Sequence, residues 1–119
     1  MAKSNRVAVI TGAAQGIGRR TAELLAERGY NVGLSDLRSP ADTMRAVAGH
    51  GVDAMELVGD IADEKKVAGF AASVRERWGR VDVLVNNAGI SMIAPAEKLT
   101  GEEYRRVLDV NLVAPFLLS

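Results

Sequence analysis

The sequence predicts an α/β fold built on a doubly wound parallel sheet. Three observations predict it: four short apolar runs alternate with amphipathic segments, a glycine-rich turn follows the first run, and polar residues stand at the end of each later run. Consecutive βα units of this kind make right-handed crossovers and place helices on both faces of the sheet. In the doubly wound order the strands lie 3-2-1-4, and a ligand binds at the switch between strands one and four.

The first unit comprises a strand over residues 6–10, a turn over residues 11–18 and a helix over residues 17–28. Gly12 lets the chain leave the strand, Gly16 leaves room for a phosphate, and Gly18 lets the helix lie close to the strand. The unpaired N–H groups at the start of this helix predict a pyrophosphate site, with Gln15 and Ile17 as further cofactor contacts. The alternative is a merely tight strand-to-helix turn.

The later elements repeat the alternation. We expect strands over residues 32–35, 54–58 and 81–85, and helices over residues 40–48 and 63–78. Gly29 is expected to cap the first helix in a left-handed conformation, and Ser39 to cap the start of the second. The spacing predicts one buried face on the first helix and one on the third, formed respectively by Ile17, Thr21, Leu24 and Leu25 and by Val67, Phe70, Ala71, Val74 and Trp78.

A last helix begins at a capping box, Thr100-Gly101-Glu102-Glu103. From residue 107 to residue 118 it is apolar on nearly every face, interrupted by Asp109 and Asn111. A helix of this kind needs cover on both sides. We therefore expect it to pack on the sheet and on another helix or subunit.

Composition excludes several function classes. The 119 residues are 48% hydrophobic and 25% charged, with 15 basic residues against 15 acidic ones, so a soluble globular protein is expected and nucleic acid is not an expected partner. No apolar run is long enough to cross a bilayer, and no secretory signal precedes the first strand. The absence of cysteine permits a cytoplasmic location, and the single histidine, His50, gives no metal site.

The acid at the end of the second strand bears on the choice of cofactor. Asp36 lies 18 residues beyond Gly18, where a carboxylate can accept hydrogen bonds from the adenosine ribose, with Leu37 as the next contact. The same charge repels a 2′-phosphate, so NAD is favoured over NADP. Arg38 keeps NADP open, because its guanidinium could hold that phosphate. In the other reading, Asp36 only caps a turn.

Two motifs resemble the short-chain dehydrogenase/reductase family: Thr-Gly-x-x-x-Gly-Ile-Gly at residues 11–18 and Asn-Asn-Ala-Gly at residues 86–89. The resemblance spans the whole chain, about the first half of a family member. It implies a Rossmann-type fold and NAD(P)-dependent hydride transfer between the nicotinamide and an alcohol or ketone. It also implies a homo-oligomer, a dimer or tetramer formed through the helix that begins near Thr100.

The resemblance also assigns residues. Asp60 and Ile61 would meet the adenine, although Asp60 could instead start the third helix, and Asn87, Ala88 and Gly89 would pass under the cofactor. Asn111 matches the active-site asparagine, whose carbonyl holds a water. Because Pro115 has no N–H, that carbonyl loses its helical partner, and we expect a kink that exposes it. In the alternative reading the kink only serves packing.

The acid/base pair of the family is absent from these residues. Tyr30 is followed four residues later by Leu34, and Tyr104 by Leu108, so neither belongs to a Tyr-x-x-x-Lys pair. We expect residues 1–119 to be an incomplete NAD(P)-binding domain that ends within the helix after strand four. Alone it should not turn over a substrate, and the open edge of its sheet should make it aggregate or dimerise. The alternatives are an inactive stand-alone dinucleotide-binding or interaction module and a fragment without a function of its own.

Overall fold

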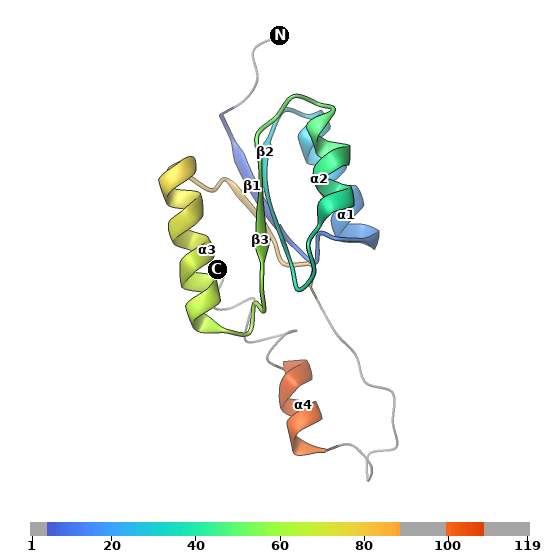
Figure 1. Cartoon of the computed structure of the whole chain (residues 1–119), viewed down its shortest axis with the longest axis vertical. Coiled ribbons are helices and arrows are strands. Elements are labelled where there is room, and N and C mark those ends of the chain that lie inside the picture. Colours follow the sequence, from blue (N-terminus) through green and yellow to red (C-terminus); the bar gives the residue numbers. More distant parts are fainter. Residues whose placement is uncertain (1–4, 89–99, 109–119) are drawn as a thin grey trace.

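Four parallel strands form one sheet in the order β3-β2-β1-β4, as predicted (Figure 1). The computed structural model describes residues 5–88 and 100–108. The strands, in chain order, are β1 (Val7–Thr11), β2 (Asn31–Asp36), β3 (Ala54–Val58) and β4 (Val83–Val85). Val9 at the centre of β1 is in register with Gly33 of β2 and Leu84 of β4.

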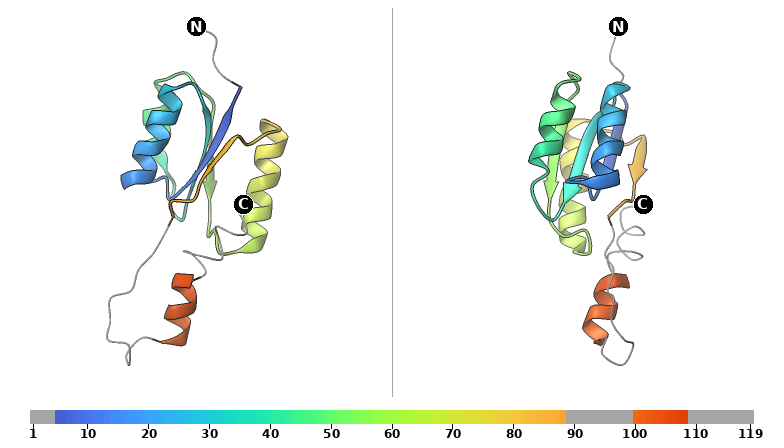
Figure 2. Two further views of the ribbon diagram at one scale, coloured as in Figure 1. Left: turned by 180° about the vertical axis from the view of Figure 1, so that it is seen from behind. Right: turned by 90° about the vertical axis from the view of Figure 1, so that its right-hand side faces the viewer.

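Helices cover both faces of the sheet, which confirms the doubly wound prediction. They are α1 (Gly16–Glu27), α2 (Ala41–Ala48), α3 (Glu64–Arg77) and α4 (Gly101–Leu108). Helices α1 and α2 lie on one face and α3 lies on the other (Figures 1 and 2). Helix α4 lies beyond the carboxyl ends of the strands, so the structure places it at the edge where a ligand is expected.

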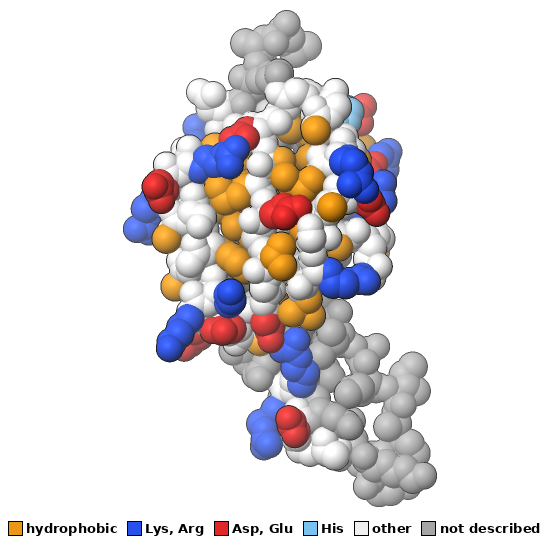
Figure 3. Space-filling model, in the orientation of Figure 1, with side chains coloured by type: hydrophobic (Ala, Val, Ile, Leu, Met, Phe, Trp, Pro, Cys, Tyr) orange, Lys and Arg blue, Asp and Glu red, His pale blue; other side chains and the backbone are white. Residues whose placement is uncertain are grey.

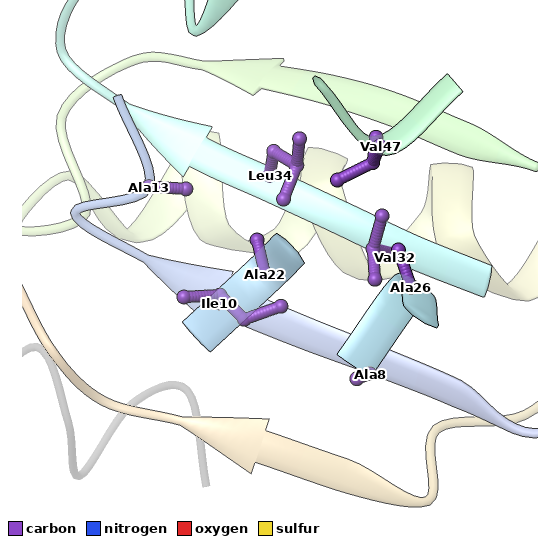
Figure 4. Packing of buried hydrophobic residues seen from close by; sticks show 8 residues of the cluster. All are labelled: Ala8, Ile10, Ala13, Ala22, Ala26, Val32, Leu34 and Val47. Atoms are coloured by element: carbon purple, nitrogen blue, oxygen red, sulfur yellow. The ribbon is translucent and has the colours of Figure 1, made fainter. Parts of the chain in front are cut away.

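Each face of the sheet has its own apolar core. The core under α1 and α2 contains eight fully buried side chains, drawn in Figure 4: Ala8, Ile10, Ala13, Ala22, Ala26, Val32, Leu34 and Val47. On the α3 side, Val7 and Val9 pack with Leu57 and Val74. Because successive residues of a strand point to opposite faces, β1 is buried on both sides and reads as a continuous apolar run.

The prediction of which face of α1 is buried is wrong. Its buried residues are Gly18, Ala22 and Ala26, whereas Ile17 is 77% exposed and Leu24 is 41% exposed. Small residues let the helix axis approach the sheet more closely than a face of large side chains would. Of the four residues expected inside, Leu25 packs half-buried against the core.

The helix ends confirm one predicted cap and correct another. Gly29 follows α1 with φ 89°, the left-handed conformation that was expected. Asp63 caps α3 and accepts hydrogen bonds from the N–H groups of Lys65 and Lys66. Ser39 does not cap α2: its hydroxyl donates to Glu56 of β3 at 2.9 Å, and Pro40 occupies the cap position instead.

The last strand of the described sheet is shorter than predicted. Val81 lies outside β4 and is 50% exposed, because Asp82 ties the chain to the start of β1 through hydrogen bonds in both directions with Val7. On α3, Val67 and Val74 are buried as expected, but Ala71 is exposed. Of the apolar stretch predicted over residues 107–118, residues 109–118 lie outside the described residues.

The opposite edge of the sheet, β3, is partly open. Figure 3 shows hydrophobic side chains between α2 and α3, with an acidic side chain among them. The acid that β3 carries is Glu56, and a charge on an edge strand opposes pairing with another chain. Within residues 5–88 and 100–108, no helix has the length and hydropathy needed to cross a membrane.

Candidate functional site

A cavity of about 340 Å³ opens beyond the carboxyl ends of the strands, where a ligand was predicted. Five segments line it: the glycine turn, the end of β2, the turn after β3, the segment after β4, and α4. The predicted site residues among its lining are Gly12, Gln15, Gly16, Ile17, Asp36, Leu37, Asp60, Ile61, Asn87 and Ala88. The lining also includes three residues that the sequence did not indicate, Ser35, Gly59 and Arg106.

One described residue of the predicted site, Gly18, does not line the cavity. Gly18 lies beneath the turn, in the contact between α1 and β1, rather than in the cavity wall. Gly89 and Asn111 lie outside the described residues, as does the kink expected at Pro115.

A larger hollow, about 490 Å³, lies on the α3 face of the sheet. Apolar residues such as Val9, Leu57, Phe70 and Leu84 form most of its wall, and none of the predicted site residues lines it. The predicted site residues that line either hollow therefore all lie in the smaller one.

Hydrogen bonds to β2 and α2 hold the glycine turn in place. Gly12 and Gly16 adopt φ 66° and 60°, a region that other residues enter at a cost. The N–H of Ala13 donates to the carbonyl of Ser35 at 3.0 Å, and the hydroxyl of Thr43 donates to the carbonyl of Ala13 at 2.7 Å. Thr43 is completely buried, and no local sequence signal connects it with a turn 30 residues away.

The start of α1 suits an anion. Gln15 occupies the cap position and makes no side-chain cap bond with any described residue, and the first turn of α1 contains no acid. A Cβ at Gly16 would meet nothing within 4 Å, so the backbone there is open to the cavity. The helix dipole and these N–H groups can therefore be neutralised by a bound phosphate.

Gly18 brings α1 against the end of β1. A Cβ at this position would lie within 3.0 Å of three atoms: the carbonyl oxygen of Gly12, its carbonyl carbon at 2.8 Å, and Nδ2 of Asn87 at 2.7 Å. The close helix–strand approach predicted for this glycine is present.

Thr11 joins the end of β1 to the segment after β4. The residue is 1% exposed. Its hydroxyl oxygen accepts hydrogen bonds from the N–H groups of Asn87 at 3.0 Å and Ala88 at 2.9 Å. Nδ2 of Asn87 then donates to the carbonyl of Gly12 at 3.3 Å. These bonds fix the two short segments against each other. The sequence signal that could have indicated this role of Thr11 is its position as a polar residue at the end of an apolar strand.

Asp36 reaches the cavity and also fixes the glycine turn. Its Oδ2 accepts a hydrogen bond from the N–H of Ala14 at 2.9 Å, and its Oδ1 accepts one from the N–H of Arg38 at 3.4 Å. The Arg38 side chain crosses to the turn, where Nη2 donates to Oε1 of Gln15 at 3.1 Å. The turn-holding reading of Asp36 and its place in the cavity wall are therefore compatible.

Asp60 does not start α3, because Asp63 does. One oxygen of Asp60, Oδ1, accepts a hydrogen bond from the N–H of Ala62 at 2.9 Å. The other, Oδ2, lies 2.7 Å from Nη1 of Arg106 on α4. The residue thus folds the turn after β3 and connects it to the only element that approaches the cavity from outside the sheet layers in the described chain.

Comparison with known proteins agrees with this arrangement. The family model for short chain dehydrogenases matches residues 6–119. The chain belongs to the short-chain dehydrogenase/reductase family. Members of this oxidoreductase family bind NAD(P) and act on small-molecule alcohols or ketones.

Individual relatives support the family assignment. The chain is 39% identical over 119 residues to galactitol 2-dehydrogenase of Agrobacterium fabrum, covering 99% of the chain and 46% of that protein. It is 43% identical over 111 residues to cis-4-hydroxycyclohexanecarboxylate dehydrogenase of Sinomonas cyclohexanicum, covering 92% of the chain and 45% of that protein. The chain therefore spans about half the length of the curated relatives it matches.

A solved structure confirms the fold of this short-chain dehydrogenase/reductase chain. A metagenomic short-chain oxidoreductase in complex with NADP superposes with a TM-score of 0.92 at 35% sequence identity, covering 98% of the chain and 54% of that structure. The Rossmann-type sheet order predicted from the sequence is the order that this family shares.

Proposed function

We propose that the cavity beyond the strand ends binds a nicotinamide dinucleotide, and that the protein transfers hydride between this coenzyme and an alcohol or ketone. The observation that carries the proposal is the convergence of three features in one cavity: two acids, and a helix start that receives no side-chain cap bond from the described residues. They come from three separate βα units. The coenzyme would supply the hydride donor or acceptor, and these residues would bind and orient it.

Each predicted residue has a place in this proposal. The pyrophosphate would bind the open N–H groups at the start of α1, and Asp36 with Leu37 would meet the ribose. Asp60 and Ile61 would meet the adenine. The segment 87–89 would pass beneath the coenzyme, and Asn111 would serve the active site.

NAD is the coenzyme we propose, with NADP as the second candidate. The carboxylate of Asp36 is held at the cavity wall by the N–H of Ala14, where it would repel a 2′-phosphate. Two observations favour the second candidate: Arg38 is bonded to Gln15 beside the cavity, and the metagenomic relative is in complex with NADP.

Isothermal titration of NADH and NADPH tests this choice. We expect tighter binding of NADH, and we expect Asp36→Asn to weaken NADH binding by roughly tenfold, since a hydrogen bond to a charged acceptor is lost. The asparagine oxygen can still accept from Ala14, so the turn should stay folded. Asp42→Asn, an equal charge change on the exposed start of α2, is the control and should bind NADH as the unchanged protein does.

Two results would contradict the proposal. Absence of binding to either coenzyme by the folded protein would remove the function itself. Tighter binding of NADPH than NADH would leave the function and reverse the choice of coenzyme.

We further propose that residues 1–119 are the NAD(P)-binding domain of a cytoplasmic homo-oligomeric enzyme that assembles through the helix beginning near Thr100. The Tyr-x-x-x-Lys pair of the family would then follow residue 119, and the share of each relative that the chain covers supports this arrangement. The stand-alone binding module is the rival, and binding of NADH without turnover of any alcohol or ketone by the protein as its gene encodes it would favour that rival.

A further inference from the structure

Arg106 joins α4 to the turn after β3 through a single ion pair. Its Nη1 lies 2.7 Å from Oδ2 of Asp60, and the two side chains are 35% and 38% exposed. The second oxygen of Asp60 is already bonded to the N–H of Ala62 at 2.9 Å. With a partner on each oxygen, both the position and the rotation of the carboxylate are fixed.

Arg106 is also distinctive within the cavity wall. Among the described residues that line the cavity, it is the one cation, and it is the one residue contributed by α4. Its neighbour on the helix, Arg105, is exposed and is not among the lining residues. The contact with Asp60 is therefore specific to one of two adjacent arginines.

We infer that Arg106 is a positioning residue, which holds the carboxylate of Asp60 in the orientation that accepts a hydrogen bond from the 6-amino group of adenine. This inference rests on the proposed function. An ionised carboxylate offers about four acceptor sites, so the bonds from Arg106 and Ala62 leave room for an amino donor. Orienting the acid beforehand removes the entropy cost of ordering its side chain when the coenzyme binds.

A fixed acid discriminates between bases. Adenine presents an amino donor where hypoxanthine presents a carbonyl oxygen, and an ionised carboxylate can only accept hydrogen bonds. The 6-oxygen of hypoxanthine would therefore face repulsion from a carboxylate fixed toward that position instead of a bond. A carboxylate that can rotate away from the base discriminates less.

The test compares NAD with nicotinamide hypoxanthine dinucleotide, in which a carbonyl oxygen replaces the 6-amino group and N1 carries a hydrogen. Affinities for both are measured by calorimetry on the protein as its gene encodes it and on the variants Arg106→Gln, Arg106→Lys and Arg105→Gln. We expect Arg106→Gln to reduce the preference for the adenine coenzyme by roughly fivefold, part of the effect of losing a charged hydrogen bond. Arg106→Lys, which keeps a charged donor, should restore much of that preference, and Arg105→Gln should leave it unchanged.

A double variant separates positioning from a general loss of structure. If Arg106 acts through Asp60, then adding Arg106→Gln to Asp60→Asn should cause little further loss of preference, because the two residues act as one unit. Thermal unfolding of each variant, followed by circular dichroism, reports whether the fold is retained.

The outcomes divide clearly. If the unchanged protein binds neither coenzyme, the proposed function fails. If the unchanged protein binds NAD and prefers it, but Arg106→Gln keeps the full preference, with or without an equal loss of affinity for both coenzymes, Arg106 only docks α4. The inference is then overturned. If the unchanged protein binds both coenzymes equally, Asp60 does not read the base, and the inference is overturned while coenzyme binding stands.

Discussion

Replacing Gly18 by alanine tests whether close packing, rather than helix preference, sets the place of α1. The added Cβ would lie within 3.0 Å of the Gly12 carbonyl and of Nδ2 of Asn87, and backbone atoms cannot rotate away. Overpacking of this kind costs about 3 kcal/mol at the upper end of its usual range, while alanine in a helix gains about 1 kcal/mol over glycine. We therefore expect Gly18→Ala to lower the free energy of unfolding by about 2 kcal/mol.

Gly69 in α3 provides a matched control. A Cβ at this glycine would meet nothing within 4 Å, so Gly69→Ala should gain the helix preference alone and raise the free energy of unfolding by up to about 1 kcal/mol. Urea unfolding of both variants, followed by circular dichroism, measures the difference. If Gly18→Ala proves as stable as Gly69→Ala, then α1 is free to move off the sheet and the close-approach argument is refuted.

Substitutions at three further positions probe the hydrogen bonds around the sheet. Thr11→Val leaves two main-chain N–H groups without their acceptor and should cost about 2 kcal/mol in urea unfolding, whereas Thr11→Ser keeps the hydroxyl and should cost less. The hydroxyl of Ser35 is buried without a partner among the described residues, so Ser35→Ala should leave the Tm unchanged or raise it, and a clear fall would show that the hydroxyl has a partner. A hydrogen bond from the Arg80 guanidinium, and to a smaller extent one from the N–H of Val7, lowers the pKa of Asp82. The acid therefore stabilises the fold at pH values above its unfolded pKa. That contribution is lost as the pH falls through its folded pKa. The Tm gap between the unchanged protein and Asp82→Asn should accordingly narrow from pH 7 to pH 3, and a constant gap would contradict the linkage.

Local patterns were sufficient to predict the order and type of the elements. Strand β1 is an apolar run because both faces of the sheet are buried there, and β3 lies where it was expected. The face of α1 could not be predicted in the same way, because its packing distance is set by Gly18 against Gly12. That contact made small residues the buried ones, and Ile17 remained outside.

The site was predictable to the extent that its residues stand at strand ends. Gly12 and Asp60 follow strands, Asp36 is the last residue of one, and parallel strands bring their carboxyl ends to one edge. The bond between Arg106 and Asp60 joins residues 46 positions apart and depends on where α4 lies. No spacing within one element predicts such a contact.

The two acids of the cavity show why structural and ligand-binding roles need not exclude each other. Asp36 and Asp60 each hold a nearby main-chain N–H, those of Ala14 and Ala62, in the turn that forms the cavity wall. A carboxylate with two oxygens keeps acceptor capacity after such a bond, and the bond fixes its direction. An acid that shapes its own turn is therefore better oriented for a sugar hydroxyl or a base amino group than one free in solvent. Under the proposed function, the turn-holding and coenzyme-binding roles of Asp36 use the same geometry, and removing the N–H partner should weaken coenzyme binding even when the acid remains.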